Sequence, residues 1–329
     1  MHFHGGDGRT RRSLRAPALA IVAALLVVSA TPRERQETPP RVARPGFAYD
    51  PVRRVTVLFG GVSDEGAYPG TWEWNGAEWR ERKIAGPSPR ANHGMTYDAR
   101  RRVIVLFGGE GPDGRTLGDT WEYDGVAWRR ASERGPSPRA GFGIAYDGAR
   151  GRTVIHGGFA DGGAQPLTDT WVWDGSTWTR VAVTGPSGTT FHRMVYDAHR
   201  QRVVAFGGRG GGGETWEWDG SSWTKAPVAG PPPRDHHAMA YDSRARRVVV
   251  FGGGRQLPGG GYDRARLWLT DLWAWDGEHW TLRSEEGPPS RGGQPGLAYD
   301  AARDRLVLFG GGALDGTWEW TGAGWERRR

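Results

Sequence analysis

The chain has 329 residues with 54 glycines, 22 prolines and 18 tryptophans, so it is neither a helical protein nor a disordered one. Its formal net charge of +7 is spread along the chain among acidic residues, which excludes the single basic stripe typical of a nucleic-acid binder. The absence of cysteine excludes disulfides, thiolate metal sites, cysteine nucleophiles and a lipoprotein anchor. These features favour an all-β fold with many turns.

Residues 1–30 have the pattern of a targeting segment. Three arginines among residues 11–15 precede an apolar run from Ala16 to Ala30, which ends in small residues suited to cleavage. A run of about 15 apolar residues fits a signal-peptide core better than a membrane span of roughly 20. The pair Arg11–Arg12 also resembles a twin-arginine signal. We expect an exported protein, periplasmic, extracellular or at the cell surface, with an uncleaved membrane anchor as the alternative and a linker over residues 31–44.

One unit occurs six times between residues 45 and 329. Each copy has a Tyr-Asp pair, a double glycine ten residues after the aspartate, a variable gap, and an aromatic-x-aromatic segment with a further tryptophan seven residues beyond its first aromatic. The pairs begin at Tyr49, Tyr97, Tyr146, Tyr196, Tyr241 and Tyr299, and the double glycines begin at Gly60, Gly108, Gly157, Gly207, Gly252 and Gly310. Fixed offsets in six copies indicate a repeat architecture.

Each copy predicts four short antiparallel strands. In the second copy, residues 94–97 form a short inner strand, residues 98–102 a polar turn, and residues 103–107 an apolar second strand that ends at the double glycine. The third strand alternates, as in residues 72–74, so its two rings share one face. An Asp-Gly pair such as Asp174–Gly175 then turns the chain into the fourth strand, which carries the last tryptophan.

These copies resemble the repeats of the kelch family, which carry a double glycine after the second strand and a spaced aromatic pair in the third and fourth strands. Gly108–Gly109, Tyr123 and Trp128 show this pattern in the second copy. The copies are 45 to 58 residues apart and cover residues 45–329, and kelch repeats have about 50 residues. The signatures of WD40 repeats and of sialidase Asp-boxes are not in register here.

The resemblance implies an all-β fold, a six-bladed kelch-type β-propeller with four antiparallel strands per blade around a central channel. Seventeen of the 18 tryptophans fall in third and fourth strands, and we expect their rings to pack between blades instead of stacking on a ligand. The ring would close by packing of the first blade on the last, or by residues 31–44 covering the join. We expect a monomer with no cofactor.

Arginines and histidines recur where the inner strands begin, at the end of the propeller that holds the double glycines. The arginines are Arg41, Arg90, Arg139, Arg234 and Arg291, and the histidines are His93, His192 and His237. A ring of guanidinium groups would hold a carboxylate-bearing ligand by bidentate hydrogen bonds, and the alternative is internal hydrogen bonding within the repeats. Zinc or copper would suit three histidines, but their spacing is uneven and no carboxylate stands at a matching position, so we expect no metal site.

The loop from Gly254 to Thr270 is the longest of its kind. From the first glycine to the next aromatic, blade five has 21 residues and the other blades have eight to 14. The loop carries Tyr262, Arg264, Arg266 and Trp268. An aromatic ring and two arginines suit sugar stacking or a protein contact, and the alternative is a loop that folds over the rim without a ligand.

These features predict a noncatalytic extracytoplasmic protein that binds a glycan or a protein segment through the rim loops and the arginine-lined channel mouth. Galactose oxidase shares the kelch fold, but its copper–radical site needs a tyrosine cross-linked to cysteine, which this chain lacks. The resemblance also includes six-bladed periplasmic sialic-acid mutarotases, so a carbohydrate-active enzyme of that type is the alternative. The sequence places no acid–base pair, and a shared fold does not carry an activity with it.

Overall fold

The computed structural model describes residues 38–161, 163, 165–181, 185–186, 189–257, 268–289, 293–312 and 316–328. Its internal contacts divide the chain into Met1–Gln36 and Glu37–Arg329. The export segment predicted over residues 1–30 lies outside the described residues, and so do Tyr262, Arg264, Arg266 and Arg291. Within the described residues, no helix has the length and apolar character needed to span a bilayer.

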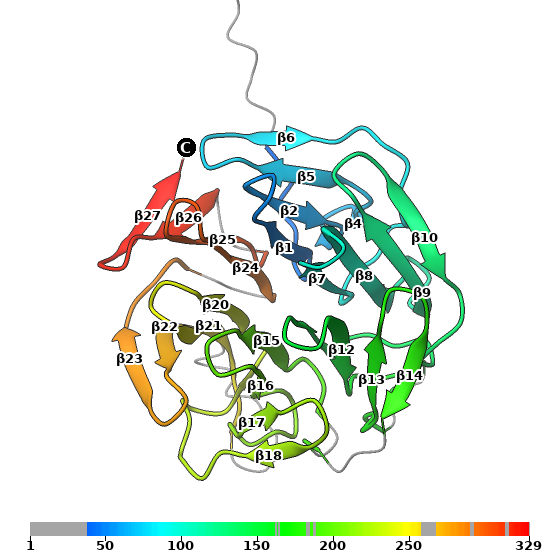
Figure 1. Cartoon of the computed structure of the whole chain (residues 1–329). Helices are drawn as coiled ribbons and strands as arrows, with labels where there is room; N and C mark the ends of the chain where they lie inside the picture. The colour runs from blue at the N-terminus through cyan, green and yellow to red at the C-terminus, as the bar shows by residue number, and fades with distance from the viewer. Residues whose placement is uncertain are drawn as a thin grey trace, which may run out of the picture. The chain divides into compact units, whose positions relative to one another are not determined.

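Six antiparallel sheets stand around a common axis in the second unit, each with its first strand innermost and its fourth strand outermost (Figure 1). The inner strands are β1 (Gly46–Asp50), β7 (Gly94–Asp98), β11 (Gly143–Asp147), β15 (Arg193–Asp197), β20 (Ala238–Asp242) and β24 (Pro295–Asp300). The second strands are β2 (Val55–Phe59), β8 (Val103–Glu110), β12 (Arg152–His156), β16 (Arg202–Phe206), β21 (Arg247–Arg255) and β25 (Arg305–Gly310). The predicted six-bladed, all-β propeller is confirmed.

The outer half of each blade completes the sheet with a hairpin. The third strands are β5 (Thr71–Trp74), β9 (Thr116–Tyr123), β13 (Thr170–Trp173), β17 (Thr215–Trp218), β22 (Trp268–Trp275) and β26 (Thr317–Trp320). The fourth strands are β6 (Trp79–Glu81), β10 (Trp128–Ser132), β14 (Trp178–Val181), β18 (Trp223–Lys225), β23 (Trp280–Ser284) and β27 (Trp325–Arg328). Three short strands lie outside this pattern, namely β3 (Val62–Ser63), β4 (Gly66–Ala67) and β19 (Arg234–Asp235).

The second strand is longer than predicted in blades two and five. β8 and β21 continue past the double glycine and pair with the first residues of β9 and β22, with a shift of register at the glycines. Gly108 and Gly109 have φ angles of 63° and 105°, which cost glycine little, so they form a bulge that bends the strand without ending it. The prediction that the strand ends there was wrong for these two blades.

The tryptophans pack between neighbouring blades, as predicted. Each fourth-strand indole packs against the aromatic ring just before the double glycine of the preceding blade, with centroids 4.9 to 5.3 Å apart. In five blades, its Nε1 also donates to a threonine in the third strand of the preceding blade, as Trp178 does to Thr120 at 2.9 Å. An indole that is buried and hydrogen-bonded at once fixes how neighbouring blades are rotated against each other.

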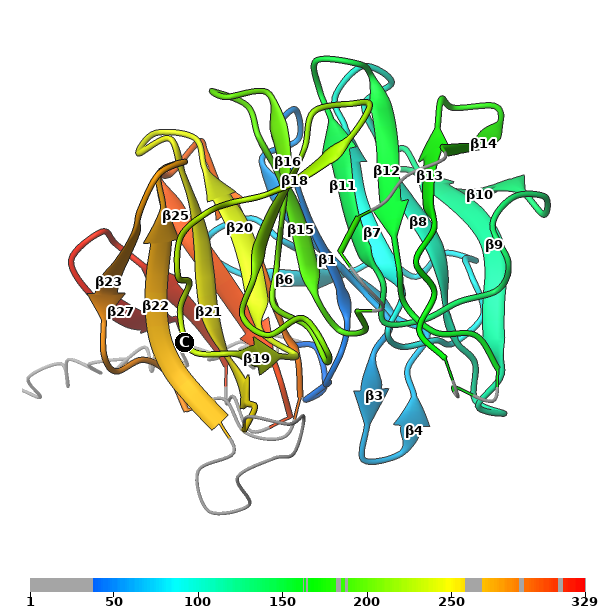
Figure 2. The same cartoon turned by 90° about the horizontal axis from the view of Figure 1, so that it is seen from below.

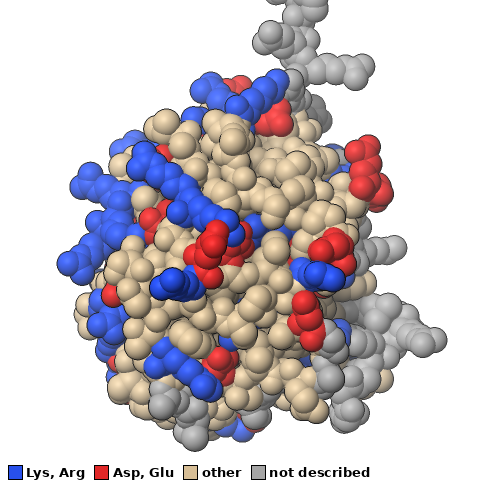
Figure 3. Space-filling model, turned by 90° about the vertical axis from the view of Figure 1, so that its right-hand side faces the viewer, with Lys and Arg blue, Asp and Glu red and all other residues tan. Residues whose placement is uncertain are grey.

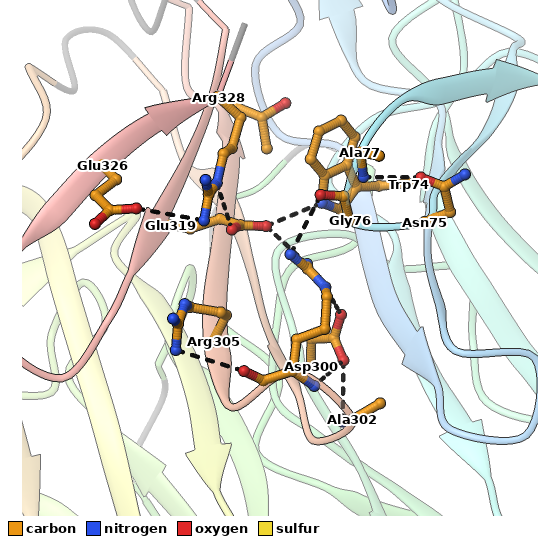
Figure 4. A network of polar contacts seen from close by, with 12 residues as sticks. Trp74, Asn75, Gly76, Ala77, Asp300, Ala302, Arg305, Glu319, Glu326 and Arg328 are labelled. Atoms are coloured by element: carbon orange, nitrogen blue, oxygen red, sulfur yellow. Dashed lines mark hydrogen bonds and ion pairs between the residues drawn. The ribbon is translucent and has the colours of Figure 1, made fainter.

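Blades six and one close the ring by direct contact (Figure 4). The buried carboxylate of Glu319 in β26 accepts hydrogen bonds from Trp74 Nε1 at 3.2 Å and from Arg328 Nε at 2.6 Å. The linker takes part as well, because Gly311 N donates to the carbonyl of Val42 at 2.9 Å. The two closures considered from the sequence therefore operate together.

Candidate functional site

The two ends of the propeller differ in shape. One end, here called the turn face, carries the turns between first and second strands and between third and fourth strands. The other end, the hairpin face, carries the double-glycine loops and the connections into each next blade. The β3–β4 hairpin and the extended end of β22 project from the hairpin face beyond the ring (Figure 2). The described residues among the sites predicted from the sequence belong to the hairpin-face half of their blades.

Arg90, Arg139 and Arg234 lie inside their blades with none of their surface exposed. All five N–H groups of Arg139 donate hydrogen bonds. The acceptors are Ser137 O and Oγ at 3.1 Å each, Gly157 O at 3.2 Å and the two carboxylate oxygens of Asp169 at 2.7 and 3.1 Å. Arg90 makes the same five bonds with Asp119 as its acid, and Arg234 makes four of them with Asp271. This geometry supports internal hydrogen bonding, the alternative to ligand contact.

The aspartates in these pairs are held as carboxylates. Burial alone would raise the pKa of Asp169, but hydrogen bonds from Arg139 and Trp171, together with the charge of Arg139, outweigh burial and lower that pKa to about 2. The same balance, with Arg90 as the cation, lowers the pKa of Asp119. Asp119 and Asp169 therefore stay charged at neutral pH. Each of the three ion pairs ties the start of an inner strand to the third strand of the same blade.

The predicted ring of arginines is not continuous. The carbonyl of Arg90 in blade two accepts a hydrogen bond from Gly61 N of blade one. At the ring closure, the carbonyl of Val42 accepts in the same way from Gly311 N of blade six. Val42 therefore takes the place of the buried arginine, and Arg41, one residue earlier, is exposed. In blade four this place belongs to Thr189, whose carbonyl accepts from Gly158 N.

The three predicted histidines are buried between blades as neutral rings. His93, His192 and His237 lie 5.7, 5.8 and 5.5 Å from Phe59, His156 and Phe206 of the preceding blades. Burial and then nearby positive charge, including that of Arg193, lower the pKa of His93 and His192 to about 3 and the pKa of His237 well below 6.5. Among the described residues, no group of three His, Asp or Glu side chains is placed to hold a metal ion.

A cavity of about 390 Å³ follows the axis of the ring between the inner strands. Since each inner strand pairs only with its own second strand, its other edge faces this channel. The wall runs from the turn face, at Ala198 and Ser243, to His93 and Arg193 near the hairpin face. Of the described residues that line the channel, Arg193 is the one with a formal charge, and none is Asp or Glu.

A circle of backbone hydrogen bonds lies beyond Arg193, where the chain enters the inner strands. The N–H groups of Asn92, Gly141, Phe191 and His236 each donate to the equivalent carbonyl of the preceding blade, at 2.6 to 3.3 Å. Arg44 N continues the circle by donating to Gln294 O at 3.0 Å. None of these residues lines the cavity, whose lining residues extend to Ala198 and Ser243 at the turn face.

Arg193 occupies an unusual position. It begins β15, at the place where the other inner strands have Gly46, Gly94, Gly143, Ala238 and Gly296. Its side chain reaches blade six, where the amide oxygen of Gln294, oriented by this contact, accepts from Nε and Nη2 at 2.8 Å each. Burial lowers the pKa of Arg193 to about 10. Sequence reasoning missed this residue, although an arginine four residues before the Tyr-Asp aspartate, where the other copies have Gly or Ala, was a visible signal.

The hairpin face also carries apolar and aromatic groups. Phe191 stacks on His236 with centroids 4.1 Å apart, and the guanidinium of Arg209 lies 5.3 Å from the centre of the Phe191 ring. Trp268, the described residue of the predicted blade-five site, pairs with Gly254 at the start of β22 and is partly buried. The other predicted residues of that loop are not described.

Surface charge is mixed. On the side that lies to the right in Figure 1, lysine and arginine side chains stand among aspartate and glutamate side chains (Figure 3). Several are paired at short range, as Arg130 is with Glu133 and Arg129 with Asp124. This side of the molecule therefore lacks the uninterrupted basic surface that a nucleic-acid backbone requires.

A family model for the KLHDC2/KLHL20/DRC7 Kelch-repeats domain matches residues 46–217, from β1 into β17. The matched stretch is just over half of the chain and spans blades one to three and most of blade four. No curated protein matches the chain.

Proposed function

The chain belongs to the kelch-repeat family, and we propose that it is a noncatalytic binding protein that works outside the cytoplasm and holds a protein segment on its hairpin face. A kelch propeller indicates a role in protein interaction at the level of the family. The extracytoplasmic location rests on the arginine-led apolar segment of residues 11–30.

The difference between the two ends carries this proposal. Loops on a rigid scaffold commonly hold binding residues, and here the loops that vary in length belong to the hairpin face. Val62 and Leu257 extend from this face with 36% and 41% of their surface exposed, next to the projecting strands. Exposed apolar groups among polar ones favour a protein contact, and a preformed scaffold lowers the entropy lost on binding.

Two alternatives share the same scaffold. A glycan would find Trp268 and the Phe191–His236 pair for ring stacking on the hairpin face. A mutarotase-like enzyme would need an acid–base pair next to a bound acidic sugar. Glycan binding, measured alongside peptide binding, tests the first alternative. Anomerisation kinetics on an acidic sugar test the second.

Peptide and glycan arrays probed with the mature chain test the proposal. We expect saturable binding to particular peptides that becomes at least tenfold weaker in the double variant Val62→Asp/Leu257→Asp. The matched control is Val52→Asp/Val126→Asp, which adds the same two charges at exposed valines of the turn face, and it should bind like the unchanged protein. Binding to glycans alone would refute a protein segment as ligand, and equal loss in both double variants would refute the hairpin face as its site.

A further inference from the structure

We propose that the central channel is a second binding site, in which Arg193 holds a small carboxylate with a compact apolar body that enters from the turn face. This site lies on the axis of the ring and is independent of the function proposed for the hairpin face. Its support comes from the partners of Arg193, the unused polar atoms around it and the character of the wall.

Arg193 differs from the other buried arginines in what it faces. Arg90, Arg139 and Arg234 each hold both oxygens of an aspartate. Arg193 contacts an amide oxygen of Gln294 and, at 3.4 Å, the carbonyl of His237, and no carboxylate of a described residue pairs with it. Removing a cation from bulk water without a counter-charge is unfavourable. An anion in the channel supplies the negative charge that the described residues around Arg193 do not provide.

The contacts of Arg193 leave one edge of its guanidinium for a ligand. Gln294 takes Nε and one hydrogen of Nη2, whereas no described residue accepts from Nη1. Nη1 and the second hydrogen of Nη2 form the planar pair of donors that matches the two oxygens of a carboxylate. The side chain lines the cavity and Arg193 is partly exposed, which is consistent with contact by a ligand in the channel.

His93 offers an unused polar group beside the same cavity. It lines the channel, only 3% of its surface is exposed, and neither ring nitrogen has a hydrogen-bond partner among the described residues. Arg193 is near enough for its charge to contribute to the low pKa of this histidine. Buried polar atoms are rarely left unpaired, and a neutral imidazole has one N–H to donate, so His93 is suited to bind a ligand oxygen or a water beside it.

The wall sets the class of anion. Met95, Met194, Met239 and Leu297 are among the residues that line the cavity, whose volume of about 390 Å³ suits a small molecule. The six tyrosines of the Tyr-Asp pairs also line the cavity, so the wall combines apolar and aromatic side chains with a single charged group. Such a wall favours an organic anion, with its carboxylate at Arg193 and its carbon body against the methionines, over a fully hydrated inorganic ion.

Methionine methyl groups report directly on this site. The chain has four methionines, and three of them, Met95, Met194 and Met239, line the channel. In protein labelled with 13C at the methionine methyl groups, titration with benzoate should shift the three channel signals in a saturable way. Benzamide has the same shape without the charge and should bind at least tenfold more weakly. Equal shifts with the two compounds, or no shift of the channel signals with benzoate, would overturn the proposal.

Variants of the same protein assign the effect to Arg193. We expect Arg193→Gln to weaken benzoate binding at least tenfold, Arg193→Lys to keep part of it, and the exposed control Arg180→Gln to leave it unchanged. Benzoate binding that survives Arg193→Gln at full strength contradicts the assignment. If Arg193→Gln fails to fold by near-ultraviolet circular dichroism, Arg193→Lys and the benzamide comparison decide. The double variant Val62→Asp/Leu257→Asp should not alter benzoate binding. A wrong assignment of the channel site is therefore distinguishable from a wrong assignment of the hairpin-face site.

Discussion

Replacing Arg139 with methionine tests whether the buried arginines are structural. Methionine retains an aliphatic stem but removes all five donors, which leaves Asp169 as a carboxylate that is only 14% exposed. Removing one partner of a buried ion pair costs about 3–5 kcal/mol of unfolding free energy. The pKa of Asp169 gives an independent lower figure, because a shift from 3.8 to about 2 corresponds to about 2 kcal/mol.

Guanidinium chloride unfolding, followed by tryptophan fluorescence, measures this cost. At pH 7 we expect Arg139→Met to lose about 3–5 kcal/mol, and the exposed control Arg130→Met, whose partner is Glu133, to lose less than about 0.5 kcal/mol. Because the pKa of Asp169 is lower in the folded state, its contribution is complete above about pH 4 and disappears as the pH falls through about 2. The difference between Arg139→Met and the unchanged protein should therefore shrink over that interval.

A double-mutant cycle separates the pair from its surroundings. Arg139→Met/Asp169→Asn should recover at least about 1 kcal/mol of the loss, because the second change removes the unpaired charge. Blade one shows the uncharged arrangement, with Val42 and Gly70 at the two corresponding positions. A loss below about 1 kcal/mol for Arg139→Met at pH 7, or additive effects in the cycle, would refute the structural role.

Two further changes test the packing between blades. The pKa of His93 is about 3 in the folded protein and near 6.5 in the unfolded chain, so its contribution to stability is complete above about pH 6.5 and is lost as the pH falls toward 3. The variant His93→Phe copies Phe142, the equivalent residue of blade three. It should reduce the slope of the unfolding free energy against pH by about 1.4 kcal/mol per pH unit over that range. An unchanged slope contradicts this. Trp178→Phe should lower the free energy of unfolding by about 1 kcal/mol more than Trp325→Phe does. Trp178 Nε1 donates to Thr120, whereas the buried Nε1 of Trp325 has no partner among the described residues. Equal losses of unfolding free energy in chemical denaturation would show that the hydrogen bond contributes nothing.

The fold was predictable because its determinants repeat at fixed distances along the chain. The aromatic residue just before the double glycine and the tryptophan of the next fourth strand, such as Phe107 and Trp178, meet in every pair of neighbouring blades. An interaction that recurs six times at constant offsets leaves one arrangement of blades that satisfies all copies. The bulges of blades two and five were missed because two glycines with positive φ fit both the end of a strand and its continuation.

The candidate site was less predictable because the partners of each arginine come from different strands. Arg90 and Asp119 are 29 residues apart, and a carboxylate two residues before the first third-strand tryptophan was visible in the copies that have the arginine. Reading these two positions together would have favoured the internal ion pair. Read one at a time, the arginines resembled a ring around the channel mouth, although the guanidinium groups of Arg90, Arg139 and Arg234 point into their own blades.

The role of Arg193 could not be inferred from its own copy of the repeat. It becomes visible only when the residue at this position is compared with its equivalents in the five other blades. At Gly143, an added Cβ would lie 2.5 Å from Met194 Sδ and 2.6 Å from His192 Nε2, so the next blade fills the space that a side chain would need. Glycine or alanine at this place therefore serves packing. An arginine there loses hydration and requires Gln294 from blade six to hold it, and a sequence chosen for stability alone would not place it on the axis. An arginine that loses hydration on folding and lines the channel fits the carboxylate site proposed above.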